Sequence, residues 1–211
     1  MAENNSINYN ILDQDTLSSN SATSLATQQS IKAYVDTQIP KKSYHHLSTQ
    51  TASNVSSIDF TGLDSTYQIY ILQYYNMVPV IDNIVTFIRV GTGGTPTYQA
   101  TGYKFANFEV NIAGTGIPDG STSTTQVSLN TTGNLTTENQ SGEIVIFNPS
   151  SATIYKDIMH KLSYVGSAGT FYRHWGSGQY ASATAVTAIR FACSSGNISV
   201  GTFKLYGLRS S

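Results

Sequence analysis

The chain has 211 residues and a formal net charge of -1, and only 11% of its residues are charged, against about 25% in average soluble proteins. A nearly neutral chain has no electrostatic attraction for phosphate or anionic lipid, so we expect neither nucleic acid nor a membrane as a direct partner. The length fits one β domain with an N-terminal extension. Ser, Thr, Asn and Gly take the place of charged residues, which is typical of β-rich extracellular or virion proteins.

Residues 1–23 are rich in Asn, Ser, Gln and Asp and cannot bury enough apolar surface to order themselves. They contain no apolar run of the kind that a secretion signal needs. The sequence also has no stretch of about 20 consecutive apolar residues, the length that would span a bilayer. We therefore expect a soluble protein that is made in a cytoplasm. The segment is either a flexible terminus or an arm that orders on a larger body, with Tyr9, Ile11 and Leu12 as anchors.

A short helix is predicted over 24–40, closed by Pro40. At about 100° per residue its apolar side chains fall within one arc of about 120°, with two polar interruptions. A helix of this length is marginal alone in water, so the stripe needs a partner, either the β domain of the same subunit or the same helix of sister subunits. β-Branched residues at such a seam permit oligomers above the dimer, and we expect a homotrimer. The residues assigned to oligomerisation are Leu25, Ile31, Val35 and Ile39.

After an expected linker over 41–54, the hydrophobic pattern takes a period of two residues. The segments 67–75 and 84–90 are rich in β-branched and aromatic residues. Turn signals follow, among them GTGGTP at 91–96 and GIPDG at 116–120. Short strands at this spacing predict an antiparallel sandwich or barrel over 55–211. The other expected strands are 103–112, 126–129, 143–147, 154–158, 162–165, 185–192 and 201–208.

No motif in the sequence indicates catalysis, so we expect a protein that is not an enzyme and needs no cofactor. His45 and His46 are adjacent and point to opposite faces of a strand, while His160 and His174 stand far from any Cys or paired carboxylate, so no metal site is expected. The glycines at 91–95 lack the Lys-Ser/Thr and the helix of a phosphate-binding loop. Neither a Gly-x-Ser-x-Gly motif nor a glycosidase-like carboxylate pair is present.

The remaining single candidates have structural explanations. Cys193 is the only cysteine, which excludes an intrachain disulfide, and its place in an alternating strand predicts a buried thiol. Asp59, Asp64 and Asp82 would suit calcium, but caps of turns and strand ends explain them more simply.

One segment suggests ligand binding. GTFYRHWGSGQY at 169–180 gathers aromatic residues between glycines and is predicted to be a long loop or hairpin. Aromatic faces with polar edges suit sugar rings. The alternative is that Trp175 fills one end of the sandwich or a trimer interface. The residues expected to contact a glycan are Tyr172, His174, Trp175 and Tyr180.

Several segments resemble structural proteins of tailed bacteriophages. TQQSIKAYVDTQI at 27–39 resembles a segment that precedes a β domain in many phage structural proteins and fibres. IDFTGLDSTYQIYIL at 58–72, PVIDN at 79–83 and GNISVGTFKLYGL at 196–208 resemble the ends of a phage jelly-roll module. The resemblance implies a virion protein, a trimeric fibre or spike with a jelly-roll head.

These expectations combine into one functional hypothesis. Residues 1–23 attach to other virion proteins, 24–40 trimerise, and a jelly-roll head over 55–211 binds host-surface glycan. The alternative is a capsid decoration or tail connector protein that clamps its neighbours and has no receptor. A polysaccharide-cleaving tailspike would need an acidic pair that the sequence does not show.

Overall fold

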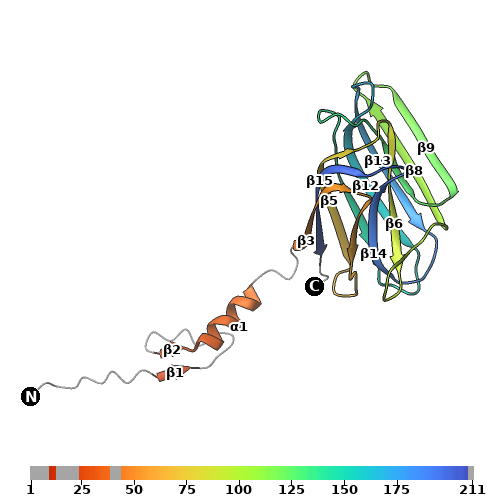
Figure 1. Ribbon diagram of the computed structural model, residues 1–211. Helices are drawn as coiled ribbons and strands as arrows, with labels where there is room; N and C mark the ends of the chain where they lie inside the picture. The colour runs from red at the N-terminus through yellow and green to blue at the C-terminus, as the bar shows by residue number, and fades with distance from the viewer. Residues whose placement is uncertain (1–9, 13–23, 39–43, 209–211) are drawn as a thin grey trace, which may run out of the picture. The chain divides into compact units, whose positions relative to one another are not determined.

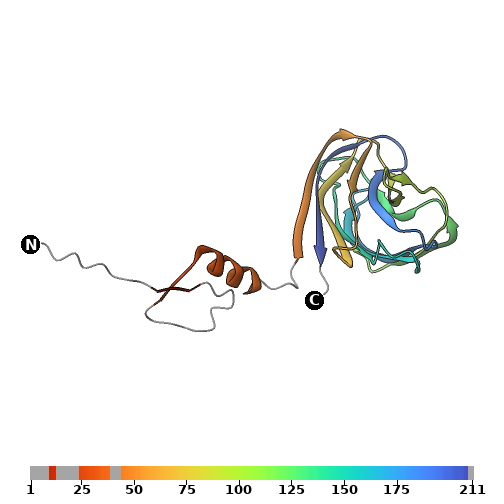
Figure 2. The same cartoon turned by 90° about the horizontal axis from the view of Figure 1, so that it is seen from below.

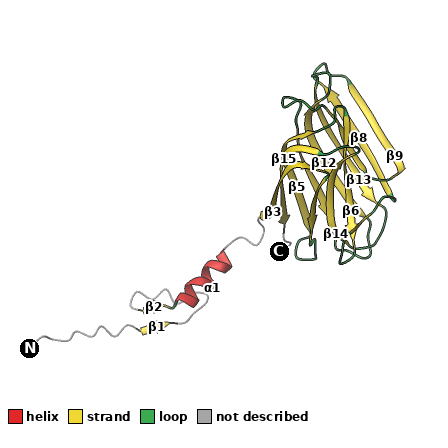
Figure 3. Cartoon of the chain, in the orientation of Figure 1, coloured by secondary structure: helices red, strands yellow, loops and turns green. Residues whose placement is uncertain are grey.

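The chain forms two units in the computed structural model, which describes residues 10–12, 24–38 and 44–208 (Figures 1 and 3). The first unit covers Met1–Lys42 and the second Ser43–Ser211. The first contains a short parallel strand pair and a helix, and the second is built of antiparallel strands. The part of the chain that the structure describes is therefore mainly β.

In the first unit, β1 (Asn10–Leu12) pairs in parallel with β2 (Ser24–Ala26), and α1 spans Gln28–Gln38. The helix thus begins later than position 24, where we expected it. Thr27 accounts for this start, because its Oγ1 accepts a hydrogen bond from the backbone N–H of Ser30 at 3.0 Å. A side chain in this role is an N-cap, which satisfies a backbone donor of the first turn and fixes where the helix begins.

The apolar stripe of the helix is exposed within the single chain. Ile31 and Val35 are 48% and 49% exposed, and Leu25, which lies in β2 rather than in the helix, is 52% exposed. Of the expected virion anchors, Ile11 is exposed in β1 and Leu12 is the last residue of that strand. Tyr9 and Ile39 lie outside the described residues.

In the second unit, two antiparallel sheets enclose one apolar core, an arrangement consistent with a β-sandwich (Figure 2). The smaller sheet has the order β10-β6-β14-β4, with β7 paired to β6, and the larger has the order β3-β15-β5-β11-β12-β13-β8-β9. The strands are β3 (Tyr44–Val55), β4 (Ser57–Thr61), β5 (Ile69–Pro79), β6 (Ile84–Thr92), β7 (Thr97–Tyr98), β8 (Tyr103–Asn111), β9 (Gly116–Thr124), β10 (Val127–Thr132), β11 (Gln140–Phe147), β12 (Lys156–Val165), β13 (Phe171–Tyr180), β14 (Val186–Cys193) and β15 (Ile198–Leu208).

Three aromatic rings join the two sheets at the centre of the core. Tyr74 of β5 and Phe203 of β15 stack with centroids 5.6 Å apart, and Phe191 of the smaller sheet packs on both at 4.9 and 5.0 Å. The hydroxyl of Tyr74 donates to Oε1 of Gln140 at 3.0 Å, so this hydroxyl is paired although it is buried. Cys193 is also buried, as expected, and burial raises the pKa of its thiol to about 11.

Three expectations about the positions of the strands were wrong. Residues 44–54, the expected linker, form most of β3, and the expected turn at 116–120 lies within β9. These two strands are the edges of the larger sheet and are largely exposed, so they show no strong apolar alternation. An edge strand also tolerates Pro118, because one row of its N–H groups pairs with no neighbour. The segments 154–158 and 162–165 belong largely to one strand, β12.

We expect Phe191→Ala to destabilise the β unit by about 3–5 kcal/mol, because it leaves a cavity among packed rings. Phe171→Ala is the matched control, since Phe171 is about half exposed at the start of β13 and its loss should cost about 1 kcal/mol or less. Urea denaturation of the two variants measures the difference. Equal losses of unfolding free energy would contradict the assigned core.

Candidate functional site

The aromatic segment singled out in the sequence is a strand, not the expected loop. β13 pairs along its whole length with β12, and from Tyr172 to Tyr180 with β8, so it lies well inside the larger sheet. Aromatic residues favour this setting, and successive side chains must point to opposite faces. Gly176 points inward, where a Cβ would lie 2.2 Å from Oδ1 of Asn107, so the strand needs glycine at this position.

The four expected glycan contacts are therefore divided between two faces. Trp175 points outward and is 38% exposed, whereas His174 and Tyr180 are only 2% and 6% exposed and cannot stack on a sugar from outside. Tyr172 is half-buried and stacks on Tyr164, with ring centroids 4.9 Å apart. Of the four, only Trp175 belongs to an exposed aromatic surface.

Trp175 lies in a groove of about 680 Å³ on the outer face of the larger sheet. The register places Glu143, Lys161, Trp175 and Phe108 in one row across β11, β12, β13 and β8. The next row on the same face carries small or slender side chains, and the groove lies above them. They are Ala106, Val145, Met159 and Ser177.

The aromatic half of this row, Trp175 and Phe108, is fixed by its contacts with neighbouring residues. The rings of Trp175 and Phe108 lie 5.1 Å apart, and the guanidinium of Arg173 lies 5.2 Å from the Trp175 ring. Phe108 also lies across Gly116 of β9, where a Cβ would come within 2.4 Å of its ring. Contacts of this kind limit ring rotation, so the groove offers a preformed apolar platform beside a cation.

The other half of the row, on β11 and β12, is polar. Nζ of Lys161 lies 3.0 Å from Oε1 of Glu143, and Nε2 of Gln73 donates to the other carboxylate oxygen at 2.9 Å. Burial acts to raise the pKa of Glu143, but the hydrogen bonds from Gln73 and Lys161 and the charge of Lys161 outweigh it and hold that pKa below its usual value. Glu143 is therefore ionised at neutral pH.

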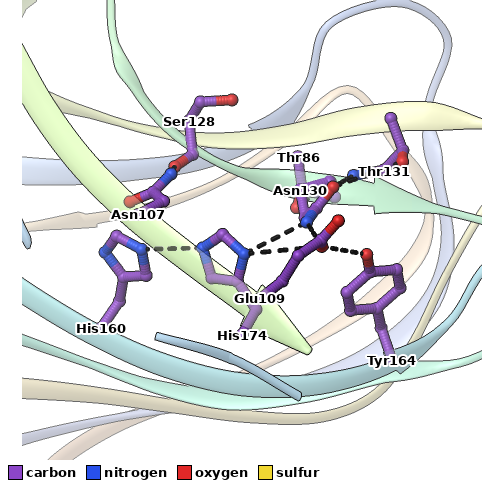
Figure 4. A network of polar contacts seen from close by, with 9 residues as sticks. All are labelled: Thr86, Asn107, Glu109, Ser128, Asn130, Thr131, His160, Tyr164 and His174. Carbon is purple, nitrogen blue, oxygen red and sulfur yellow. Dashed lines mark hydrogen bonds and ion pairs between the residues drawn. The ribbon is translucent and has the colours of Figure 1, made fainter. Parts of the chain in front are cut away.

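On the inner face of the larger sheet lies a polar network, in which the two histidines are buried and Glu109 and Asn130 are half-buried (Figure 4). Nδ2 of Asn130 donates to Glu109 and to Nδ1 of His174, the latter at 3.1 Å, and the hydroxyl of Tyr164 donates to Glu109 at 2.5 Å. Because His174 accepts at Nδ1, it carries its proton on Nε2 and donates to Nε2 of His160 at 3.1 Å. A pocket of about 290 Å³ reaches this network between β9 and β10.

The histidine pair is neutral at physiological pH. Burial lowers the pKa of His160 to about 3, with a further contribution from His174, and burial lowers the pKa of His174 to about 4. Nδ1 of His160 and Oδ1 of Asn107 are buried with no hydrogen-bond partner among the described residues. The pair meets end to end through its Nε2 atoms, which is the geometry of an N–H···N hydrogen bond.

The described residues contain no group of three or more His, Cys, Asp or Glu side chains placed to hold a metal ion. Each aspartate considered for calcium has a partner within the protein. Asp59 forms two hydrogen bonds with Arg190, at 2.8 and 2.6 Å. Asp64 accepts from the N–H of Thr66, and Asp82 from the N–H of Asn83, each at 2.8 Å. The described helix is also too short and too polar to cross a membrane.

Sequence reasoning missed most of the residues that surround Trp175. Phe108 lies far away in the sequence, and only the strand register brings it to Trp175. Lys161 and Glu143 could not be linked to the segment without knowing that β11, β12 and β13 are consecutive neighbours. Period-two alternation in 169–180, had it been applied there, would have separated Arg173 and Trp175 from His174.

Comparison of the chain with protein-family models, curated proteins and solved structures finds no match.

We expect the protein to lose stability as the pH falls from 7 to 5. Each histidine has an ordinary pKa of about 6.5 when unfolded and a lowered pKa when folded, so the unfolded chain binds more protons below pH 6.5. The unfolding free energy should fall by about 1.4 kcal/mol per pH unit for each histidine at pH values below about 6. In His174→Gln this slope should be about half as steep. Chemical denaturation at several pH values tests this, and an unchanged slope would contradict a neutral buried pair.

Proposed function

We propose that this chain is a non-enzymatic virion protein of a tailed bacteriophage, a fibre or spike that binds glycan on the host surface. The observation that carries the proposal is the exposed pair of Trp175 and Phe108 in a preformed groove on the larger sheet. Paired aromatic faces next to hydrogen-bonding side chains are suited to the apolar face and hydroxyl edge of a sugar ring.

The strand order supports a jelly roll. We number β4, β5, β6, β8, β9, β10, the β11–β13 meander and β14 as eight successive positions. In these numbers the smaller sheet has the strand order 1-8-3-6. The larger sheet has the order 2-7-4-5. This is the order of a jelly roll whose seventh strand has been replaced by a three-stranded meander. β3 and β15 extend the larger sheet beyond β5.

The division of the chain supports a fibre or spike. The β unit has its own core, while the first unit carries a capped helix with exposed Ile31 and Val35. An apolar stripe of this kind is stabilised when copies of the helix pack together. In this proposal the segment before the helix binds other virion proteins, and the protein is assembled into particles in the host cytoplasm.

We expect the isolated protein to be a trimer, with three times the chain mass of 22.8 kDa. Sedimentation equilibrium at micromolar concentration measures this mass. Ile31→Asp combined with Val35→Asp should lower it towards that of a single chain and leave the melting temperature of the β unit nearly unchanged, because the helix belongs to the other unit. A monomeric wild-type protein would contradict the trimer.

We expect Trp175→Ala combined with Phe108→Ala to abolish binding of the labelled protein to host cells. Each lost ring contact is weak, about 1 kcal/mol, but weak sites on several heads act together through avidity. The β unit should stay folded and its melting temperature should fall by only a few degrees, because both rings lie outside the apolar core. Flow cytometry measures binding, and Tyr155→Ala is the control because Tyr155 is exposed outside the groove.

Unchanged binding by the double variant would contradict a receptor site in this groove. A wild-type protein that binds no host cell, with a label that lies flush with the particle in electron micrographs, would instead favour the decoration or connector function.

A further inference from the structure

The charge of the groove is unbalanced around Arg173. Its guanidinium forms no ion pair and no hydrogen bond with any described residue, and its contact is with the face of Trp175. The residues that oppose Arg173 on the neighbouring strands are Ser163 and Val110, so neither strand supplies a carboxylate there. Lys161 adds a second positive charge, and Glu143 is the only carboxylate among the residues that line the groove.

Two other arginines lie over aromatic rings in this protein. Arg89, over Phe87, donates to the carbonyl of Thr125 and to Gln126, whereas Arg190 is paired with a carboxylate. The guanidinium of Arg190 lies 3.8 Å from the centroid of Tyr98 and binds both carboxylate oxygens of Asp59. A guanidinium fork matches the two oxygens of a carboxylate, and the bidentate pair is stronger than a neutral hydrogen bond. Arg173 has the aromatic ring of this arrangement and lacks the carboxylate.

We propose that the ligand supplies this carboxylate, and that the groove binds an acidic saccharide that contains a uronic acid or a similar carboxylated sugar. The inference rests on the proposed glycan-binding function and names the class of glycan. The sugar carboxylate binds the guanidinium of Arg173, and the ring packs on Trp175 and Phe108. Ser177 and the carboxylate of Glu143 also line the groove and can accept hydrogen bonds from the sugar hydroxyls.

The groove differs from a general anion site in its small net charge and its mainly apolar lining. Arg173 and Lys161 exceed Glu143 by one positive charge only, and the rest of the lining is mainly apolar or uncharged. One excess charge fits one carboxylate per bound segment, and the aromatic pair requires a ring to pack against. Binding to such a site should weaken as salt concentration rises, because the exposed charges are screened.

The test uses the full chain and surface polysaccharide extracted from host cells, before and after chemical reduction of its carboxyl groups to alcohols. Biolayer interferometry measures the affinity for both. We expect carboxyl reduction and Arg173→Gln each to weaken binding by about ten- to a hundredfold. Arg89→Gln removes the same charge from the smaller sheet and should leave the affinity unchanged.

Three other outcomes each overturn a different statement. The first outcome is equal binding of native and reduced polysaccharide, with binding lost only in Trp175→Ala. This result would overturn the proposal that the ligand is acidic and would still support glycan binding. Binding that survives carboxyl reduction but is lost in Arg173→Gln would contradict the carboxylate and assign Arg173 to another acceptor of the polymer, a hydroxyl or a phosphate. Binding that neither Trp175→Ala nor Arg173→Gln changes would overturn the proposed function together with this inference.

Discussion

The alternation of side chains along β13 is the constraint on which the rest of this site depends. Hydrogen bonds to β12 and β8 hold the strand extended, so neighbours in the sequence must separate to opposite faces. His174 is thereby buried, while Arg173 and Trp175 reach the surface. One ten-residue segment thus contributes to the buried network and to the outer groove, and a change in its register would exchange the two faces.

The interior below the groove is polar. Glu109, Asn130 and the histidine pair hydrogen-bond to one another at the end of the larger sheet where β8 and β9 lie, whereas aromatic rings fill the centre. Buried polar groups of this kind stabilise a fold only while their partners remain in place. Glycine at position 176 is part of this arrangement, because any side chain there would displace Asn107 and His160.

Much of the fold could be predicted from the sequence, because interior strands such as 67–75 and 84–90 are rich in apolar and β-branched residues, which indicate a buried strand. The edge strands β3 and β9 could not, since an exposed edge leaves no apolar period. Of the four expected glycan contacts, only Trp175 lines the groove. Trp175 was identified from its residue type, but Phe108 and Lys161 reach it through strand pairing, which one sequence does not reveal. The helix begins at Gln28 rather than at position 24 because the hydroxyl of Thr27 caps its first turn, a feature that the apolar pattern does not reveal.

The groove is built on paired strands rather than on loops, and this has a consequence for the divergence of such proteins. Outward residues such as Met159 and Arg173 contribute little to the core, so they can be exchanged while the sheet persists. The inward residues beneath them, His160 and Gly176 among them, have no such freedom. Substitutions that change this groove while the fold persists would therefore fall on every second residue of β12 and β13, and they would follow the pleat of the sheet.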